Sequence, residues 1–367
     1  MKAGWEMKTF DDVCYKASSN VSQNQLNDEV GIYPIFGASG KIKNVSFYHH
    51  DKPYLSIVKD GSGVGRVTKM DAFSSVIGTL QYILPKENID LDYLYYSLIS
   101  IDFKKYVAGA AIPHIYFKDY KNEPFLWTPI QEQKRIVAIL DKAFEQIAIV
   151  RANTEKNLQN TRALFESHLQ NVFSVRGEPV EPQHPSTSSG RTCGGWEVKR
   201  FNDVLEIKNG KDQKPVEKTN GQYPIYGSAG NVMGWTDAYI CEAQTTIIGR
   251  KGTINKPIFI ETRFWNVDTA FGLSAKPVLN PKFLYFFCLS YDFSSHNRGT
   301  TIPSLVKTDL LEIKISIPSL SKQEDLVREF SKLQDETQRL ESLYQRKLNA
   351  LDTLKKSLLH QAFAGEL

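Results

Sequence analysis

The sequence predicts a mixed α/β protein in which one unit, an α+β domain followed by a long helix, occurs twice. The octet YPIFGASG at residues 33–40 returns as YPIYGSAG at residues 223–230. Residues 131–173 and 321–363 contain neither proline nor glycine and carry apolar side chains at three–four spacing. That spacing is typical of an amphipathic helix.

The duplication extends well beyond the octet at a nearly constant offset. The stretch DYLYYSLIS at 92–100 aligns with KFLYFFCLS at 282–290, and GAAIPHI at 109–115 aligns with GTTIPSL at 299–305. A repeat of roughly 190 residues is far too long for a solenoid, whose units span some 20 to 50 residues. The duplication therefore concerns a whole structural unit.

Residues 1–130 and 196–320 have the pattern of two α+β domains. Short apolar and β-branched runs, such as PYLSIVKD at 53–60 and QTTIIGRK at 244–251, are separated by glycines and predict strands and turns. The aligned aromatic stretches at 92–100 and 282–290 predict a short helix in each domain.

Residues 131–173 and 321–367 follow these domains as two long spacer helices. The apolar stripe is narrow enough for a coiled-coil seam, and each helix would be about 60 Å long at 1.5 Å per residue. Pro129 and Pro318, followed by polar and acidic residues, are typical N-terminal signals. Alternatively, each stripe packs on its own domain, although one such domain would not cover forty residues.

Residues 174–195 join the two units and are rich in proline, glycine and serine. They lack apolar periodicity, which predicts a flexible linker. The letters RGEPVEPQHPSTSSGRT resemble the in-frame translation of a small repetitive bacterial DNA element. The linker would then be an insertion without a functional role.

Composition limits the possible classes of protein. The net charge is only +4, and residues 1–130 carry 14 basic and 14 acidic side chains, so a nucleic-acid binder would need locally clustered cations. No apolar run reaches the length of a membrane span, and the first residues lack the apolar core of a secretory signal. The four cysteines form no CxxC pair, which indicates a reducing cytoplasm and no zinc site.

Catalytic motifs are not found in the sequence. The stretch GSGVGR at 61–66 has Arg66 where a dinucleotide-binding motif has its last glycine. There is no GxxxxGK[ST] phosphate loop, no HExxH and no metal-spaced set of cysteine and histidine. We expect a binding protein with no catalytic residue and no metal.

The order of domain, long helix, domain and long helix resembles the specificity subunit of type I restriction–modification systems. The resemblance covers the chain except for the linker, and its most specific element is the helix start containing QEQKRIVAIL. The first unit carries it in YPIFGASG, VKDGSGVGRV, GAAIPHIYFKDY, TPIQEQKRIVAILDKAFEQI and LFESHLQNVF. The second unit carries it in YPIYGSAG, IIGRKGTINKP, GTTIPSL and LKKSLLHQAFAGEL.

The resemblance implies two target-recognition domains, each reading one half of a two-part sequence in double-stranded DNA. The helices would pair as an antiparallel coiled coil that sets the gap between the half-sites, with pseudo-two-fold symmetry. Two methyltransferase subunits would bring S-adenosylmethionine and methylate adenine, and restriction subunits would translocate and cut DNA with ATP and Mg. This cytoplasmic chain would itself be non-catalytic and bind no cofactor.

The candidate DNA contacts are polar, basic and aromatic residues in loops, because such side chains reach base edges or phosphates. In the first unit they are Lys41, Lys43, Tyr48, His49, Lys59, Ser62, Arg66, His114, Tyr116 and Lys118. In the second unit they are Trp235, Arg250, Lys251, Thr253, Asn255, Lys256, Arg298, Thr300 and Thr301. The alternative for each is an ordinary solvated side chain on a turn.

The octets themselves favour an architectural role, because the two units share them. The dissimilar residues that follow, 41–49 and 231–235, are better suited to reading sequence, and their differences predict an asymmetric target. The competing function is a duplicated coiled-coil scaffold that joins protein partners without reading DNA. A nuclease or methyltransferase in its own right is disfavoured by the missing motifs.

Overall fold

The structure is a computed structural model that describes residues 4–109, 111–174, 192–193 and 195–367. Most of the predicted linker, 174–195, therefore lies outside the described residues. The contacts divide the chain into unit 1, which comprises Met1–Thr154 and Arg346–Leu367, and unit 2, which comprises Glu155–Gln345. Each unit contains one mixed domain and a segment of both long helices.

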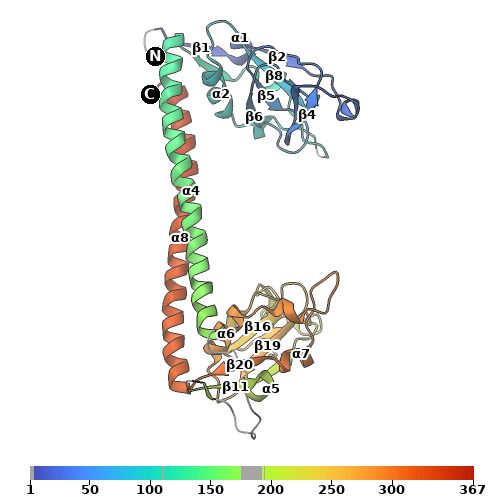
Figure 1. Ribbon diagram of the computed structural model, residues 1–367, viewed down its shortest axis with the longest axis vertical. Coiled ribbons are helices and arrows are strands. Elements are labelled where there is room, and N and C mark those ends of the chain that lie inside the picture. The colour runs from blue at the N-terminus through green and yellow to red at the C-terminus, as the bar shows by residue number, and fades with distance from the viewer. Residues whose placement is uncertain (1–3, 110, 175–191, 194) are drawn as a thin grey trace, which may run out of the picture. The chain divides into compact units, whose positions relative to one another are not determined.

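The mixed domain of unit 1 precedes the first long helix, α4 (Ile130–Ser174) (Figure 1). Its elements are β1 (Glu6–Thr9), α1 (Phe10–Val13), β2 (Cys14–Ser18), η1 (Gln23–Leu26), β3 (Tyr33–Gly37), β4 (Gly40–Val45), β5 (Tyr54–Val58), β6 (Val67–Met70), β7 (Ser75–Val76), β8 (Leu80–Pro85), α2 (Leu91–Ile99), η2 (Phe103–Tyr106), α3 (Phe117–Tyr120) and β9 (Pro124–Trp127).

The mixed domain of unit 2 precedes the second long helix, α8 (Leu320–Ala364). Its elements are β10 (Thr192–Cys193), β11 (Trp196–Arg200), α5 (Phe201–Val204), β12 (Leu205–Asn209), β13 (Glu217–Lys218), β14 (Tyr223–Tyr226), β15 (Val232–Thr236), β16 (Thr245–Gly249), β17 (Ile258–Ile260), β18 (Trp265–Asn266), β19 (Ala270–Ala275), α6 (Pro281–Ser290), η3 (Phe293–His296), α7 (Lys307–Leu311) and β20 (Lys314–Ile317).

Both units contain the same pair of sheets. The larger sheet has the order β2-β8-β5-β6 in unit 1 and β12-β19-β16-β17 in unit 2, and all its pairings are antiparallel. The smaller sheet has the order β4-β3-β7 in unit 1 and β13-β15-β14-β18 in unit 2. The predicted mixed α/β fold with two repeated domains is confirmed.

Each octet forms a strand of the smaller sheet. β3 pairs antiparallel with β4 and parallel with β7, and β14 pairs in the same two ways with β15 and β18. Ile35 and Ile225, at equivalent positions in the octets, have no exposed surface. The octets therefore belong to the cores, in agreement with their architectural interpretation.

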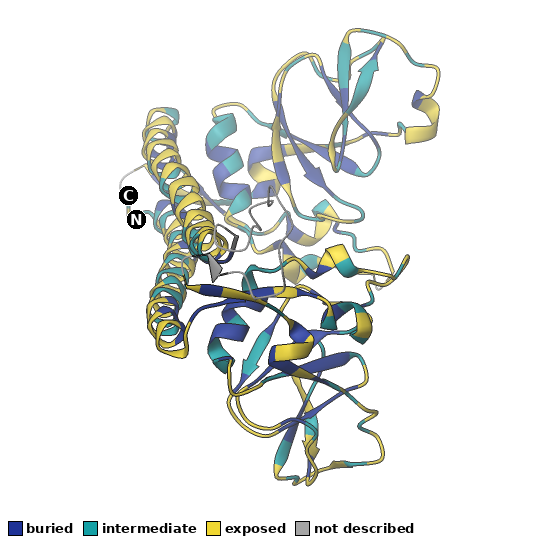
Figure 2. Cartoon of the chain, turned by 60° about the horizontal axis from the view of Figure 1, so that its bottom comes forward, coloured by how far each residue is buried: buried dark blue, intermediate teal, exposed yellow. Residues whose placement is uncertain are grey.

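The long helices complete the hydrophobic core of each unit. In unit 1, the start of α4 (Ile136 and Leu140) and the end of α8 (Leu359) share one buried cluster with the larger sheet. In unit 2, the end of α4 (Phe173) and the start of α8 (Phe330) do the same. Figure 2 shows many strands of the mixed domains in dark blue and much of the surface of the long helices in yellow.

A buried glutamine holds the start of each long helix. Gln133 is fully buried; its amide nitrogen donates to the carbonyl oxygens of Asn88 (3.0 Å) and Thr128 (2.7 Å), and its oxygen accepts from the N–H of Asp90 (2.8 Å). Gln323 of α8, also fully buried, makes the equivalent bonds in unit 2. The buried glutamine of QEQ (131–133) therefore joins the start of α4 to the turn before α2, and that of KQE (322–324) joins the start of α8 to the turn before α6.

Within each unit, the α4 and α8 segments run antiparallel. In unit 1, Arg151 of α4 pairs with Asp352 of α8 (2.5 Å), and Lys355 lies over the ring of Phe144 (5.0 Å). In unit 2, the pairs are Arg162 with Glu341 (2.6 Å) and His168 with Glu329 (3.0 Å).

We find no helix in the described ranges that combines the length and the apolar character required to cross a membrane.

Candidate nucleic-acid interface

Two loops of unit 1 that carry predicted DNA contacts are joined by backbone hydrogen bonds. The N–H of Gly61 donates to the Pro113 carbonyl oxygen, and the N–H of Ile115 donates to the Lys59 carbonyl oxygen, both at 2.9 Å. Gly61 has φ of +87°, a conformation that side-chain-bearing residues rarely adopt. The structure thus brings together six predicted residues: Lys59, Ser62, Arg66, His114, Tyr116 and Lys118.

Unit 2 repeats this connection. The N–H of Gly252 donates to the Pro303 carbonyl oxygen (2.9 Å), and the N–H of Leu305 donates to the Arg250 carbonyl oxygen (2.8 Å). Gly252 has φ of +80°. Five predicted residues are brought together here, namely Arg250, Lys251, Arg298, Thr300 and Thr301, and Thr253 lies in the same glycine-containing loop.

A third loop, which contains Ile77 and Thr79 in unit 1, connects the octet to the two loops described above. In unit 1, the N–H of Lys59 donates to the Thr79 carbonyl oxygen (3.0 Å), and the N–H of Ile77 donates to the Phe36 carbonyl oxygen (2.9 Å). In unit 2, the equivalent bonds join Arg250 to Thr269 and Val267 to Tyr226. Each unit therefore presents a row of three connected loops, built alike but carrying different side chains.

Cations and aromatic rings alternate along the unit 1 loops. Lys118 Nζ lies 5.2 Å from the centroid of the Tyr116 ring, which is 46% exposed and packs against His114 (5.0 Å between centroids). Ser62 and Arg66 are exposed. Lys59 Nζ has Asp60 Oδ2 at 3.6 Å. These groups are of the kinds that contact phosphate and stack on sugar or base.

The predicted residues that follow the first octet differ in how far their side chains are engaged. Lys41 is exposed on β4, whereas Lys43 Nζ donates to the carbonyl oxygens of Leu26 (2.7 Å) and Asn27 (3.3 Å). The carbonyl oxygens hold the ammonium group of Lys43 against its own domain. Lys41 is therefore the more accessible cation of the two.

Tyr48 and His49 belong to an aromatic cluster. The Tyr48 ring packs edge-on against Tyr33 and Phe73, and His49 Nδ1 lies 2.7 Å from the Tyr82 hydroxyl. Burial lowers the pKa of His49, so its ring is neutral at pH 7. His49 could therefore donate or accept a hydrogen bond but would not neutralise a phosphate at that pH.

Three of the predicted residues of unit 2 have partners within the domain. Arg250 Nη1 donates to the Asp268 carbonyl oxygen (3.1 Å), and Arg298 Nε donates to Asp309 Oδ2 (2.7 Å). Asn255 is bonded most extensively, because its amide nitrogen donates to Asp292 and Ser294 and its oxygen accepts from the N–H of Phe293. Lys251, Thr253, Lys256, Thr300 and Thr301 are exposed.

Trp235 lies apart from this loop row, on β15 opposite Pro224. Its side chain is 45% exposed and lines a cavity of about 560 Å³ with Tyr223 and Arg263. The cavity is open and aromatic, so the indole ring remains available to a partner.

Sequence reasoning missed two lysines beside the unit 1 loops. Lys16 of β2 and Lys121, just after α3, line a cavity of about 440 Å³ together with the predicted residues Lys59, Tyr116 and Lys118. Lys16 and Lys121 are more than one hundred positions apart, so no local motif contains both. Alternation along β2 would have put Lys16 on the face of the buried Cys14, so the strand pattern gives no sign of it.

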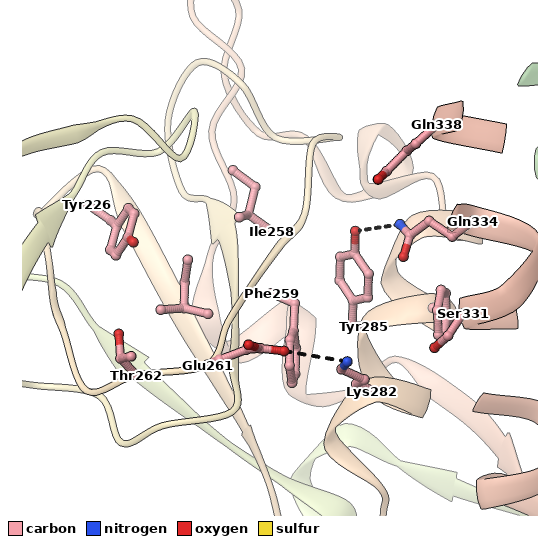
Figure 3. A pocket seen from close by; sticks show the side chains of 12 residues that line it. Tyr226, Ile258, Phe259, Glu261, Thr262, Lys282, Tyr285, Ser331, Gln334 and Gln338 are labelled. Atoms are coloured by element: carbon pink, nitrogen blue, oxygen red, sulfur yellow. Dashed lines mark hydrogen bonds and ion pairs between the residues drawn. The ribbon is translucent and has the colours of Figure 1, made fainter. Parts of the chain in front are cut away.

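Sequence reasoning also missed a polar cleft in unit 2, where β17, α6 and α8 meet (Figure 3). The cleft has a volume of about 490 Å³. Gln334 of α8 donates its amide to the Tyr285 hydroxyl (3.2 Å), and Lys282 of α6 pairs with Glu261 (3.5 Å). Lys282 and Glu261, the charged residues of the lining, therefore neutralise each other.

The family model described as type I restriction modification DNA specificity domain matches residues 2–160 and again residues 194–349. The chain belongs to this family. Both matches begin near the start of a mixed domain and extend into the long helix that follows it. The repeated arrangement of the chain is therefore that of two type I specificity domains.

Curated relatives and solved structures agree with this family. The chain is 22% identical to the EcoDI specificity subunit of Escherichia coli over 99% of this chain and 88% of that protein. It is 20% identical to the MjaVIII specificity subunit of Methanocaldococcus jannaschii over 89% and 82% of the two chains.

Two solved structures share the fold. One, reported under a title on complex assembly and conformational transition of the type I R-M system, has a TM-score of 0.79 at 15% identity and covers 100% of this chain and 99% of its own. The HsdS subunit from Thermoanaerobacter tengcongensis has a TM-score of 0.58 at 15% identity, covering 100% and 98%.

Proposed function

We propose that this chain is the non-catalytic DNA-reading subunit of a type I restriction–modification complex and that it recognises a bipartite, asymmetric target. Its membership of the specificity family carries the proposal. The difference between the two loop rows supports the asymmetry: the glycine loop reads KDGSGVGR in unit 1 and GRKGTINK in unit 2. Different side chains on the same backbone would select different half-sites.

In this proposal the long helices form an antiparallel coiled coil that acts as the spacer between the half-sites. The antiparallel ion pairs within each unit and the 45-residue length of α4 and of α8 support it. Two methyltransferase subunits would dock on the chain and supply S-adenosylmethionine. The restriction subunits would supply the ATP- and Mg-dependent activities, so the chain itself would need no cofactor.

The genome-wide methylation pattern tests the proposal. The chain should be co-expressed with its cognate adenine methyltransferase in a host that lacks other adenine methylation. Methylation-sensitive long-read sequencing then maps the modified sites. We expect one motif of two unlike half-sites separated by a gap of constant length. A methyltransferase that is active on other substrates and yet leaves no such motif would contradict the proposal.

The alternative scaffold function makes a different prediction. A scaffold that joins proteins without reading DNA would show no retention of one duplex over another when the assembled complex is challenged at increasing salt. Phosphate contacts alone weaken steeply with salt. Sequence-dependent retention at high salt would therefore exclude the scaffold.

A further inference from the structure

The cavity of about 440 Å³ in unit 1 has a basic lining. Lys16 comes from β2, Lys59 from the glycine loop, Lys118 from α3 and Lys121 from the residue after it, while Asp11 is the acidic residue of the lining. Four lysines and one aspartate give the lining a formal charge of 4 − 1 = +3. This excess is notable in a domain whose first 130 residues balance 14 cations against 14 anions.

Two of these lysines lack a carboxylate partner. Lys121 pairs with Asp11 at 2.9 Å, and Lys59 has Asp60 at 3.6 Å. Lys16 is exposed, and Lys118 Nζ lies over the ring of Tyr116; in the described part of the chain neither has a carboxylate within 4.0 Å. These two ammonium groups are available to an anion.

The lining of the cavity also contains polar groups from the larger sheet. Gln81 of β8 is 2% exposed and donates its amide to the hydroxyl of Tyr120, which is fully buried. Ser18 of β2 lies opposite Gln81 in the sheet register and also lines the cavity. Lysine, serine, glutamine and tyrosine are among the side chains that contact phosphate oxygens.

Unit 2 lacks three of these four lysines at the same place in its fold. The sheet register puts Ile207 where unit 1 has Lys16, because Lys16 faces Ile83 in β8 and Ile207 faces Leu273 in β19. Thr308 and Leu311 occupy the positions of Lys118 and Lys121 at the offset of 190. Arg250, at the position of Lys59, and Lys307, at the position of Phe117, keep cations there, but both are engaged within the domain: Arg250 Nη1 donates to the Asp268 carbonyl oxygen (3.1 Å) and Lys307 Nζ to that of Ile207 (2.6 Å).

We propose that this cavity of unit 1 is a phosphate-binding site and that it takes one backbone phosphate of the DNA half-site read by that unit. The choice of DNA as the source of the phosphate rests on the proposed function. A free phosphate ion has the same chemistry and is the second source to be tested. Because one phosphate would share Lys16 and Lys118, their contributions to binding are not additive.

The salt dependence of DNA binding tests the site in the assembled methyltransferase complex, with a duplex of about 30 base pairs. Each phosphate contact contributes about 0.9 to the slope of log K against log salt. We expect Lys16→Gln and Lys118→Gln each to lower that slope by about 0.9, and the double variant to lower it by the same amount. Lys16→Arg should keep the slope, as should Lys142→Gln, which removes an exposed lysine of α4 outside the cavity.

The second arm of the test titrates the isolated full chain with inorganic phosphate. Calorimetry and the ³¹P line width measure the binding. Binding that Lys16→Gln weakens tenfold or more would support the site with a free ion as its source. Two results together would overturn the proposed site: the variants leave the salt slope unchanged in a complex that still binds DNA, and they leave the phosphate titration unchanged. If the wild-type complex binds no duplex, the proposed function fails, and the phosphate titration alone then decides the cavity.

Discussion

At the residue scale, adjacent side chains of one loop in unit 2 have different roles. Asn255 uses its amide to bond Asp292, Ser294 and the N–H of Phe293, whereas Lys256 is exposed. We predict that Lys256→Gln weakens DNA binding and lowers the salt slope by about 0.9 without lowering the thermal midpoint. Asn255→Ala should instead lower the midpoint, because the loop loses its anchor. Equal thermal midpoints for Lys256→Gln and Asn255→Ala would contradict this assignment of roles.

The buried Gln133 offers a second test at this scale. Replacing it by alanine leaves the N–H of Asp90 and the carbonyl oxygens of Asn88 and Thr128 without their partner. Because each unmet buried group costs about 1 kcal/mol or more, we expect Gln133→Ala to lower the free energy of unfolding of unit 1 by about 3 kcal/mol. Denaturant titration measures it. Gln131→Ala, at an exposed position of the same turn, should stay within about 0.5 kcal/mol.

Residue type alone could propose Asn255 and Lys43 as DNA contacts but could not reveal how they are used. The partners of Asn255 lie 37 and 39 positions away, and Lys43 bonds carbonyl oxygens 16 and 17 positions away. Backbone carbonyl oxygens are present in every residue and leave no mark in a sequence. Glycine, by contrast, predicted the loops well, because Gly61 and Gly252 need positive φ.

At the element scale, an ion pair in each unit joins a strand, or the residue after it, to a helix. The cation and the anion are placed oppositely in the two units. In unit 1, Lys69 of β6 pairs with Asp92 of α2 (2.7 Å); in unit 2, Lys282 of α6 pairs with Glu261, which follows β17 (3.5 Å). The cation is on the strand in one unit and on the helix in the other. The sheet register puts Phe259, not Glu261, at the position of Lys69, so the two pairs are anchored at different places on the strand.

A double-mutant cycle in unit 1 tests this pairing. Asp92→Lys should place two cations together and lower the free energy of unfolding by up to about 1 kcal/mol, as for other exposed pairs. Adding Lys69→Glu should restore most of the loss by forming an ion pair with the charges reversed. A double variant that is no more stable than Asp92→Lys would show that the pair contributes nothing.

The sequence predicted most elements well because their causes are local. The helix starts follow the prolines at 129 and 318, and the strands follow runs of β-branched residues. The apolar stripe alone left open what covers each helix, and at both ends of α4 a mixed domain covers part of it. In unit 1 the stripe at the start of α4 packs on the domain that precedes it (Leu140), and in unit 2 the stripe at its end packs on the domain that follows (Phe173). Contacts between residues far apart in the chain decide this.

At the scale of the whole molecule, the proposed spacer predicts how the target depends on helix length. Deleting one heptad from the middle of both α4 and α8 would shorten each helix by about 10 Å, at 1.5 Å per residue. The gap between methylated half-sites should then shrink by about three base pairs, at 3.4 Å each, while both half-sites stay the same. Methylome sequencing measures the gap. Persistent methylation with an unchanged gap would show that the helices do not set it.

The shared cores also bear on how such a chain could acquire new domains. The unit 1 core is completed by Leu359 and Ala362, residues encoded more than two hundred codons after the domain that they cover. A recombination event that exchanges only the first 130 codons brings a new domain but not the end of α8. The surface of the incoming domain must therefore already fit the helix end of the chain that receives it. Incoming domains that keep the aromatic α2 surface, with Tyr93 against Phe363, meet that condition. Exchange is then easy among relatives that preserve this surface and vary only their loops.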